Sequence, residues 1–189
     1  MNIKLKSAEH LEELEVNKLL KYLSQNELWT YYILVRLGIS SALRYSDLSQ
    51  IAWRDILGRN KITIKEKKTG RVREIPLNPE LVQNLTSVYL KQGSPEPNSR
   101  LISLTIRGVN KQLKIYAAKS GIRGKRISSH TFRKTFGREV WKRNNHSEAS
   151  LVKLSQLFRH SSTAITRIYL SITKEEVDNL YDIQDLFMY

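Results

Sequence analysis

One stretch of alternating apolar and polar residues interrupts a sequence that otherwise has helical spacing. In KITIKE the side chains alternate, KKTG is a turn signal, and RVREIP resumes an extended pattern. The stretch therefore predicts a β-hairpin between residues 59 and 76, with residues 67–70 at its tip. The fold class that follows is mainly α with a small antiparallel β-sheet (α+β).

Apolar residues on both sides of the hairpin recur at helical intervals. Ser7 is the expected N-cap of a first helix that includes Leu11 to Leu23, and Ser46 that of a third helix within residues 41–53. The other predicted helices cover 27–37, 79–90, 105–119, 131–143, 148–159, 163–170 and 174–186. The segment QGSPEPNSR (92–100) is interpreted as an internal loop, because no second composition or repeat follows it. We therefore expect a single domain over residues 1–189.

The charge balance indicates a polyanionic partner. The chain has 32 Lys and Arg against 18 Asp and Glu, a net charge of +14, so nucleic acid is the first candidate and an anionic membrane surface the second. No apolar run approaches the roughly 20 residues of a membrane span, and the amino terminus lacks the apolar segment of a signal peptide. The chain has no cysteine. We expect a cytoplasmic protein without a metal site or a disulfide.

The positive charge is concentrated between Lys119 and Arg143, which include nine Lys or Arg and a single acid, Glu139. Within this stretch, HTFRKTF (130–136) puts a histidine and an arginine one helical turn apart. Apolar residues interleave with the bases, as in a helix whose buried stripe backs a basic surface. The pattern indicates DNA binding and leaves catalysis open.

Three further segments contain residues that favour catalysis over DNA binding alone. LRYSDL (43–48) places an arginine before a helix, KKTG (67–70) places lysines at a hairpin tip, and RHSSTAITRIYL (159–170) has a histidine nine residues before a tyrosine. In order, these segments and HTFRKTF supply Arg, Lys, His-x-x-Arg, His and Tyr.

This order resembles the tyrosine recombinases, the phage-integrase family, over about residues 26–172. The family's G-L-R-x-x-E/D-L appears as SALRYSDL, its K-T-G hairpin as KKTGRVREIPL, its H-x-x-R box as SHTFRKTF, and its L-G-H-x-S…T…Y as LFRHSSTAITRIY. Departures are small: Ala42 stands where the family has glycine, and Phe158–Arg159 where it has Leu-Gly. The resemblance implies the integrase catalytic-domain fold and this catalytic set: Arg44, Lys68, His130, Arg133, His160 and Tyr169.

The reaction that the resemblance implies is a site-specific recombination of DNA, without metal or other cofactor. Tyr169 attacks the scissile phosphate to give a 3′-phosphotyrosyl bond, and a second strand's 5′-hydroxyl reverses the step. Two guanidiniums stabilise the phosphorane-like transition state, His130 is the candidate base, and Lys68, favoured over Lys67, protonates the leaving oxygen. Asp47 is interpreted as structural, bonding backbone or an arginine of the site.

Expected partners are double-stranded DNA, other copies of the chain in a tetramer on DNA, and accessory DNA-bending proteins. The acidic tail (174–189) has an apolar side and is expected to dock on a neighbouring protomer or on its own domain. The residues expected to contact DNA are Lys67, Arg71, Arg73, Arg123, Lys125, Arg126, Lys134 and Arg138. Only about 25 residues precede the second predicted helix, too few for the amino-terminal domain of many members. The chain therefore resembles short, catalytic-domain-only members of mobile elements, although an excised fragment stays an alternative.

Other functions fit less well. A type IB topoisomerase uses nearly the same residues but usually has Lys in place of the box histidine. A serine resolvase or a two-metal nuclease would need a motif that is absent here. A helix-turn-helix regulator would explain the charge, but it has no use for the complete catalytic set.

Overall fold

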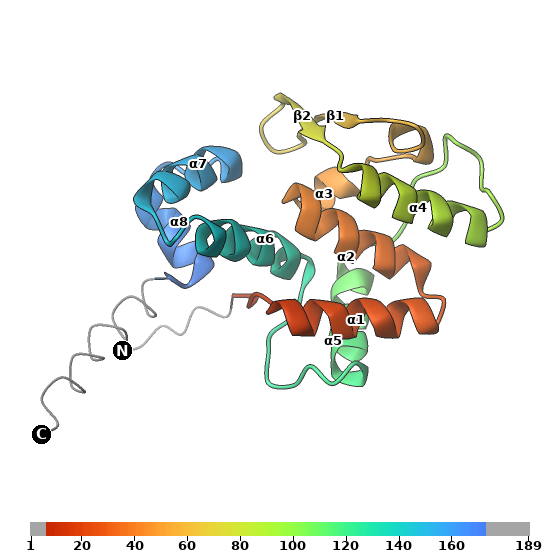
Figure 1. Ribbon diagram of the computed structural model, residues 1–189, viewed down its shortest axis with the longest axis horizontal. Helices are drawn as coiled ribbons and strands as arrows, with labels where there is room; N and C mark the ends of the chain where they lie inside the picture. Colours follow the sequence, from red (N-terminus) through yellow and green to blue (C-terminus); the bar gives the residue numbers. More distant parts are fainter. Residues whose placement is uncertain (1–6, 173–189) are drawn as a thin grey trace, which may run out of the picture. The chain divides into compact units, whose positions relative to one another are not determined.

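A computed structural model describes residues 7–172 of the chain, and these residues divide between Phe136 and Gly137 into two compact units (Figure 1). The described part is mainly helical with one two-stranded antiparallel sheet, which confirms the predicted fold class. The single domain predicted over residues 1–189 stays a prediction, and the predicted tail helix (174–186) lies outside the described residues.

The elements of the first unit are α1 (Glu13–Gln25), α2 (Trp29–Ser41), α3 (Tyr45–Leu48), a 3-10 turn (Trp53–Asp55), β1 (Lys61–Lys65), β2 (Val72–Pro76), α4 (Pro79–Lys91) and α5 (Ile106–Lys119). Helix α6 (Ser129–Arg143) begins in this unit and continues into the second, which also contains α7 (Glu148–Phe158) and α8 (Thr163–Leu170).

Helix α2 forms the centre of the first unit. Its side chains Ile33, Val35 and Leu37 are fully buried, because α1, α3 and α4 all pack against it (Figure 1). Helix α1 contributes one apolar face, with Leu19 and Leu23 fully buried. A helix surrounded on most sides has to be apolar almost all round, which is what the sequence of α2 provides.

The first helix does not begin at Ser7 as predicted. It begins at Glu13, where the Glu12 amide donates to Glu15 Oε2 at 2.8 Å and closes a capping box. The residues before it have other partners: the Glu9 amide donates to the Arg126 carbonyl at 2.9 Å. Leu11, which is 3% exposed, is thus buried in the core but belongs to the segment before the helix.

The helix predicted to start at Ser46 is also wrong in its start and length. Helix α3 covers four residues, Tyr45–Leu48, and its N-cap is Arg44. The following segment pairs with a distant one: the Leu101 amide donates to the Ile51 carbonyl at 3.0 Å. This long-range pairing overrides the helical spacing of the apolar residues.

The hairpin forms where it was predicted. Strands β1 and β2 pair in the register Lys61↔Pro76 to Lys65↔Val72. Ile62, Ile64 and Ile75 face the core, and residues 66–71 form the connection. Gly70 has a φ of +68°, a conformation that a side chain would strain, so the turn requires its glycine.

In the second unit, α7 and α8 pack on the end of α6. Ser147 and Ser162 are the N-caps of α7 and α8, accepting hydrogen bonds from the Ser150 and Ile165 amides at 3.3 Å each. Phe158 and Leu170 are at most 1% exposed. A Cβ on Gly137 would lie 2.7 Å from Leu170 Cδ2 and 2.9 Å from Phe158 Cζ, so this glycine permits the close packing.

At two positions where the family has glycine, this sequence has another residue, and both positions follow the end of a helix with a left-handed backbone conformation. Ala42 follows α2 with a φ of 55°, and Arg159 follows α7 with a φ of 59°. Replacing the exposed Arg159 by glycine should relieve the strain of its side chain and raise the free energy of unfolding by about 0.5–1 kcal/mol.

Urea unfolding would measure this change. Lys153→Gly, on an exposed position inside α7, is the matched control and should lower stability by about 1 kcal/mol. A loss of stability in Arg159→Gly as well would contradict the assignment of a strained cap.

Candidate active site

A buried turn positions Arg44. Helix α2 ends at Ser41, Ala42 reverses the chain, and Arg44 then caps α3 with an extended backbone. Ala42 and Leu43 are 0% and 1% exposed, so the core holds the turn in place. Arg44 itself is half-buried. A packed turn rather than a surface loop therefore carries the first predicted arginine.

The start of α6, which carries the predicted H-x-x-R pair, is fixed by three hydrogen bonds. Ser128 Oγ accepts from the His130 amide at 3.2 Å, and the Ser128 amide donates to Thr131 Oγ1 at 3.1 Å. The Ser129 amide donates to Asn110 Oδ1 of α5 at 2.8 Å. These bonds satisfy amides that a helix start would otherwise leave without a partner.

A close approach between α2 and α6 directs Arg133 inward. A Cβ on Gly38 would lie 2.8 Å from Phe132 Cβ, so the two helices meet with no room for a larger residue. The next residue, Arg133, is 3% exposed, and its Nη1 donates to the Ala42 carbonyl. Arg133 thus reaches the turn that carries Arg44.

The two arginines act on His130. The imidazole keeps an exposed edge, but the surrounding protein removes part of its hydration. This desolvation, followed by the charges of Arg133, Arg44 and Lys134, lowers the pKa of His130 below its usual value. The first unit therefore brings Arg44, His130 and Arg133 together, with the histidine favoured in its neutral form.

Lys68 lies at the exposed tip of the hairpin, and the base of that tip is attached to α3. The Lys67 amide donates to Asp47 Oδ1 at 2.9 Å, and Asp47 is fully buried. This confirms the prediction that Asp47 bonds backbone. Because Asp47 is three residues after Arg44, one short helix connects the predicted lysine to the predicted arginine.

In the second unit, His160 and Tyr169 lie side by side. Their ring centroids are 5.2 Å apart at an angle of 71°, and the centroids of the Phe158 and Tyr169 rings are 5.5 Å apart. Nδ1 of His160 is 3.0 Å from Thr166 Oγ1, which fixes the orientation of the imidazole. Because Thr166 and Tyr169 are three residues apart on α8, the tyrosine and the threonine that orients His160 lie on adjacent turns of the helix.

The residues predicted to contact DNA differ in exposure. Four of them are exposed: Lys67, Arg71, Arg123 and Arg126. The other four are partly or fully buried. Lys125 bonds Glu15, Arg138 lies over the Trp141 ring, and Arg73 donates to the Ser41 carbonyl at 2.8 Å. Lys134 is 3% exposed and donates to Ser7 Oγ at 3.2 Å, a position that does not favour contact with DNA.

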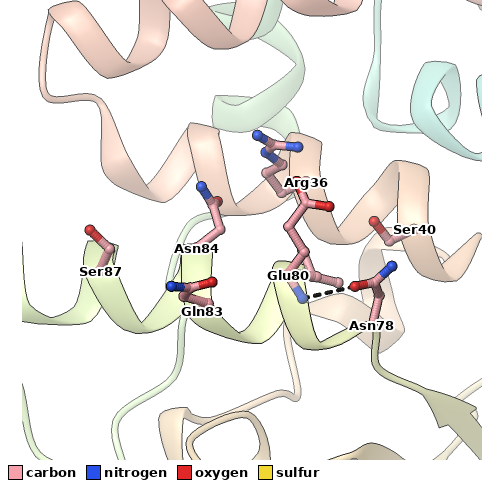
Figure 2. Close-up of a pocket in the computed structure, with 8 residues that line it drawn as sticks. Arg36, Ser40, Asn78, Glu80, Gln83, Asn84 and Ser87 are labelled. Atoms are coloured by element: carbon pink, nitrogen blue, oxygen red, sulfur yellow. Dashed lines mark hydrogen bonds between the residues drawn. The ribbon is translucent and has the colours of Figure 1, made fainter.

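A cavity of about 370 Å³ between α2 and α4 contains none of the predicted site residues (Figure 2). Its polar groups serve the packing of the two helices. Arg36 Nε donates to the Tyr32 hydroxyl at 3.2 Å, which in turn donates to Asn84 Oδ1 at 3.1 Å. Asn78 caps α4 by accepting from the Glu80 amide.

Residues 7–172 offer neither a membrane span nor a metal site. No helix in this part of the chain is long and apolar enough to cross a membrane. In the same range, no three His, Asp or Glu side chains form a group that could hold a metal ion.

Comparison with known proteins connects this geometry to a family. The model of the phage integrase family matches residues 9–176. The chain belongs to the phage integrase family. The match confirms the predicted resemblance and includes all six predicted catalytic residues within its range.

Curated relatives of this family member are recombinases. The probable integrase/recombinase YoeC of Bacillus subtilis is 26% identical over 189 residues, covering 95% of this chain and 94% of the relative. The tyrosine recombinase XerC of Xanthomonas campestris is 26% identical over 155 residues, covering 79% of this chain but 46% of the relative. The chain thus spans about half the length of XerC.

Solved structures confirm the fold. The XerH site-specific recombinase bound to its palindromic difH substrate gives a TM-score of 0.70 at 20% identity, over 94% of this chain and 54% of that one. The catalytic domain of bacteriophage HP1 integrase gives 0.59 at 20% identity, over 86% of this chain and 87% of that one. Together with the family match, the recombinase relatives confirm a tyrosine-type site-specific recombinase. Neither the topoisomerase nor the regulator is favoured.

Proposed function

We propose that this chain cuts and rejoins double-stranded DNA through Tyr169, with the other five predicted residues assisting at the phosphate. The observation that carries the proposal is the cluster of Arg44, His130 and Arg133 in the first unit. Two guanidiniums there flank a histidine whose pKa is lowered. A surface that only binds DNA has no need of a histidine held in its neutral form. A phosphoryl transfer needs both a base of this kind and guanidiniums that stabilise the charge on the phosphate.

The arginines supply the charge that the transition state requires. Attack on a phosphodiester develops negative charge on two non-bridging oxygens, and a guanidinium offers a planar fork that stays charged. Arg133 is held by the Ala42 carbonyl, so part of its donor set is fixed before DNA binds. Preorganised donors of this kind contribute most of the stabilisation in many enzymes.

In the proposed cleavage step, every bond formed or broken and every proton transferred involves only the protein and the DNA. The Tyr169 oxygen bonds to phosphorus, the bond from phosphorus to the 5′-oxygen breaks, and the 3′-phosphate stays on the tyrosine. His130 takes the phenol proton, Lys68 gives a proton to the departing 5′-oxygen, and His160 donates to a non-bridging oxygen. A 5′-hydroxyl from a second strand reverses these steps and completes the exchange.

The proposed partners follow from charge and from the neighbours. The net charge of +14 suits a DNA backbone. Solved neighbours include XerH bound to difH and a lambda integrase dimer bound to a core site. We propose double-stranded DNA in the cytoplasm as the substrate. A tetramer on DNA, joined through the tail (174–189), and accessory DNA-bending proteins complete the proposal. The exposed bases Lys67, Arg71, Arg123 and Arg126 are the proposed phosphate contacts.

A suicide substrate tests the proposed function. Duplexes nicked next to the cleavage position, tiled across the DNA that flanks the gene, would trap a covalent adduct because a short fragment escapes. We expect an adduct in the presence of EDTA that disappears in Tyr169→Phe. Tyr89→Phe, whose ring packs on Trp53, is the matched control and should form the adduct normally. Binding to every duplex without an adduct on any of them would contradict the proposal.

The pKa of His130 predicts the pH dependence of cleavage. A lowered pKa keeps the imidazole neutral at neutral pH and ready to accept a proton. The rate of single-turnover cleavage should therefore stay level as the pH falls toward about 6.5, the usual pKa of histidine, and decline below it. The free energy of unfolding should also decline as the pH falls. The unfolded chain takes up the His130 proton at a higher pH than the folded chain, so stability is lost between about pH 6.5 and the lower pKa of the folded state.

The control is His130→Gln, which should cleave more slowly and lack this decline. A wild-type rate that already falls above the usual histidine pKa would contradict a neutral, desolvated base.

A further inference from the structure

A buried carboxylate lies at the base of the hairpin tip, and the mechanism above does not use it. Glu66 is 1% exposed, although it directly precedes the exposed lysines. Burial of a carboxylate is costly unless hydrogen bonds and an opposite charge compensate for it. The partners of Glu66 therefore indicate what its burial achieves.

Glu66 holds the tip from its own side. Its Oε2 accepts from Thr69 Oγ1 at 2.8 Å, and its backbone carbonyl accepts from the Gly70 amide at 2.8 Å. The Glu66 amide donates to the Arg71 carbonyl at 2.9 Å. The carboxylate and backbone of one residue thus close the turn that presents Lys68.

Arg73 connects this turn to the turn that carries Arg44. Its Nη1 is 3.6 Å from Glu66 Oε1, and its Nη2 donates to the Ser41 carbonyl at 2.8 Å. Its side chain is 12% exposed. In the hairpin register Arg73 pairs with Ile64, on the face that points to the core. Arg73 was predicted as a DNA contact from its charge, but its guanidinium is directed away from the solvent.

The two neighbouring carbonyls of this turn are bound from two directions. Arg73 of β2 donates to the Ser41 carbonyl, and Arg133 of α6 donates to the Ala42 carbonyl. The strand after the Lys68 tip and the helix with the second catalytic arginine thus share one anchor just before Arg44.

We propose that the Glu66–Arg73 pair is a positioning device that fixes the Lys68 tip relative to Arg44 and Arg133. The proposal rests on the proposed function, because it assigns the pair to the proton transfer from Lys68. Arg73 then acts through the lysine and not as a contact to DNA. Removing either member should leave the fold and DNA binding in place but misplace the general acid.

The outer face of the same hairpin offers a matched control. Lys61 and Glu74 form an ion pair at 2.8 Å with both side chains more than half exposed; Lys61 lies on β1, which directly precedes Glu66, and Glu74 lies next to Arg73 on β2. Glu74→Gln matches Glu66→Gln in chemistry, and Lys61→Gln matches Arg73→Gln in the charge removed. An exposed pair contributes little to stability, so the control variants should resemble the wild type.

Two nicked duplexes distinguish positioning from other effects. One has the natural 5′-oxygen at the cleavage position, and the other has a bridging sulfur in its place. A thiolate leaves without a proton, so cleavage of the sulfur substrate does not need Lys68. On the oxygen substrate we expect Glu66→Gln and Arg73→Gln to lose about tenfold to 10²-fold in cleavage rate, as a misplaced catalytic group does. On the sulfur substrate both should return to within a few-fold of the wild type, as should Lys68→Ala.

Each other outcome overturns the proposal in a recognisable way. Equal losses on both substrates would mean a general structural role, and a weaker binding of Arg73→Gln to DNA with normal cleavage at saturation would make Arg73 a DNA contact. Failure of Lys68→Ala to recover would remove the general acid on which the pair acts. If the wild type cleaves neither substrate, the proposed function itself fails.

A measurement without DNA tests the same device. Hydrogen exchange at the Gly70 and Lys67 amides reports on the order of the tip, since the Gly70 amide donates to the Glu66 carbonyl and the Lys67 amide donates to Asp47 Oδ1 of α3. Exchange should become at least about tenfold faster in Glu66→Gln and Arg73→Gln and stay unchanged in the two control variants. Unchanged exchange in all four would show that the pair does not hold the tip.

Discussion

Replacing Arg133 by lysine should lower the rate of strand cleavage by about 10²–10³-fold, the loss typical of removing one preorganised donor. Lysine keeps the positive charge but not the planar fork that can bind the Ala42 carbonyl and a phosphate oxygen together. Single-turnover cleavage of the nicked duplex at saturating protein would measure the loss. Because the charge is kept, we expect DNA affinity to change by only a few-fold.

Arg143→Lys is the matched control on the same helix. Arg143 is exposed and pairs with Glu139 at 2.6 Å, so its replacement should leave cleavage unchanged. Arg133→Ala should in addition lower stability by about 1–3 kcal/mol, because it leaves the buried Ala42 carbonyl without this donor. A normal cleavage rate in Arg133→Lys would contradict the role of the guanidinium.

Replacing Gly137 by alanine should destabilise the second unit by about 1–3 kcal/mol and slow cleavage through Tyr169. The added Cβ would lie 2.7 Å from Leu170 Cδ2 and 2.9 Å from Phe158 Cζ. Both side chains are at most 1% exposed, so neither can move aside into solvent without disturbing its neighbours. Leu170 is the neighbour of Tyr169 in the chain and the Phe158 ring packs against that of Tyr169, so the displacement should reach the proposed nucleophile.

Thermal unfolding and adduct formation would measure the two effects separately. Gly108→Ala in α5 is the control, because its Cβ would meet only Thr105 Oγ1, at 3.2 Å. Alanine favours a helix by up to about 1 kcal/mol over glycine, so this control should be neutral or more stable. A Gly137→Ala variant of wild-type stability would show that the packing around Tyr169 is looser than described.

The sequence predicts those parts of the fold that depend on local pattern. The hairpin forms at the predicted residues, because strand alternation and the turn chemistry of Gly70 agree. The residues after Leu48 do not form the predicted helix, because Ile51 pairs with Leu101, a residue far away along the chain. Spacing carries no information about such a partner.

The same division applies to the site. Motif order predicts Arg44, His130 and Arg133 as site residues, and the first unit brings these three side chains together. Charge alone grouped Lys134 and Arg73 with the DNA contacts, whereas the structure directs both inward, to Ser7 and to the Ser41 carbonyl. The distinction depends on which polar atoms lie within reach in three dimensions.

The most direct test of the proposed reaction is to identify the residue that holds the DNA. After trypsin and nuclease digestion of the trapped adduct, mass spectrometry would locate the remaining 3′-nucleotide. We predict it on the peptide of residues 168–174, IYLSITK, in which Tyr169 is the only tyrosine. A nucleotide on another peptide, or attachment through a serine, would contradict the assignment of Tyr169 as the nucleophile.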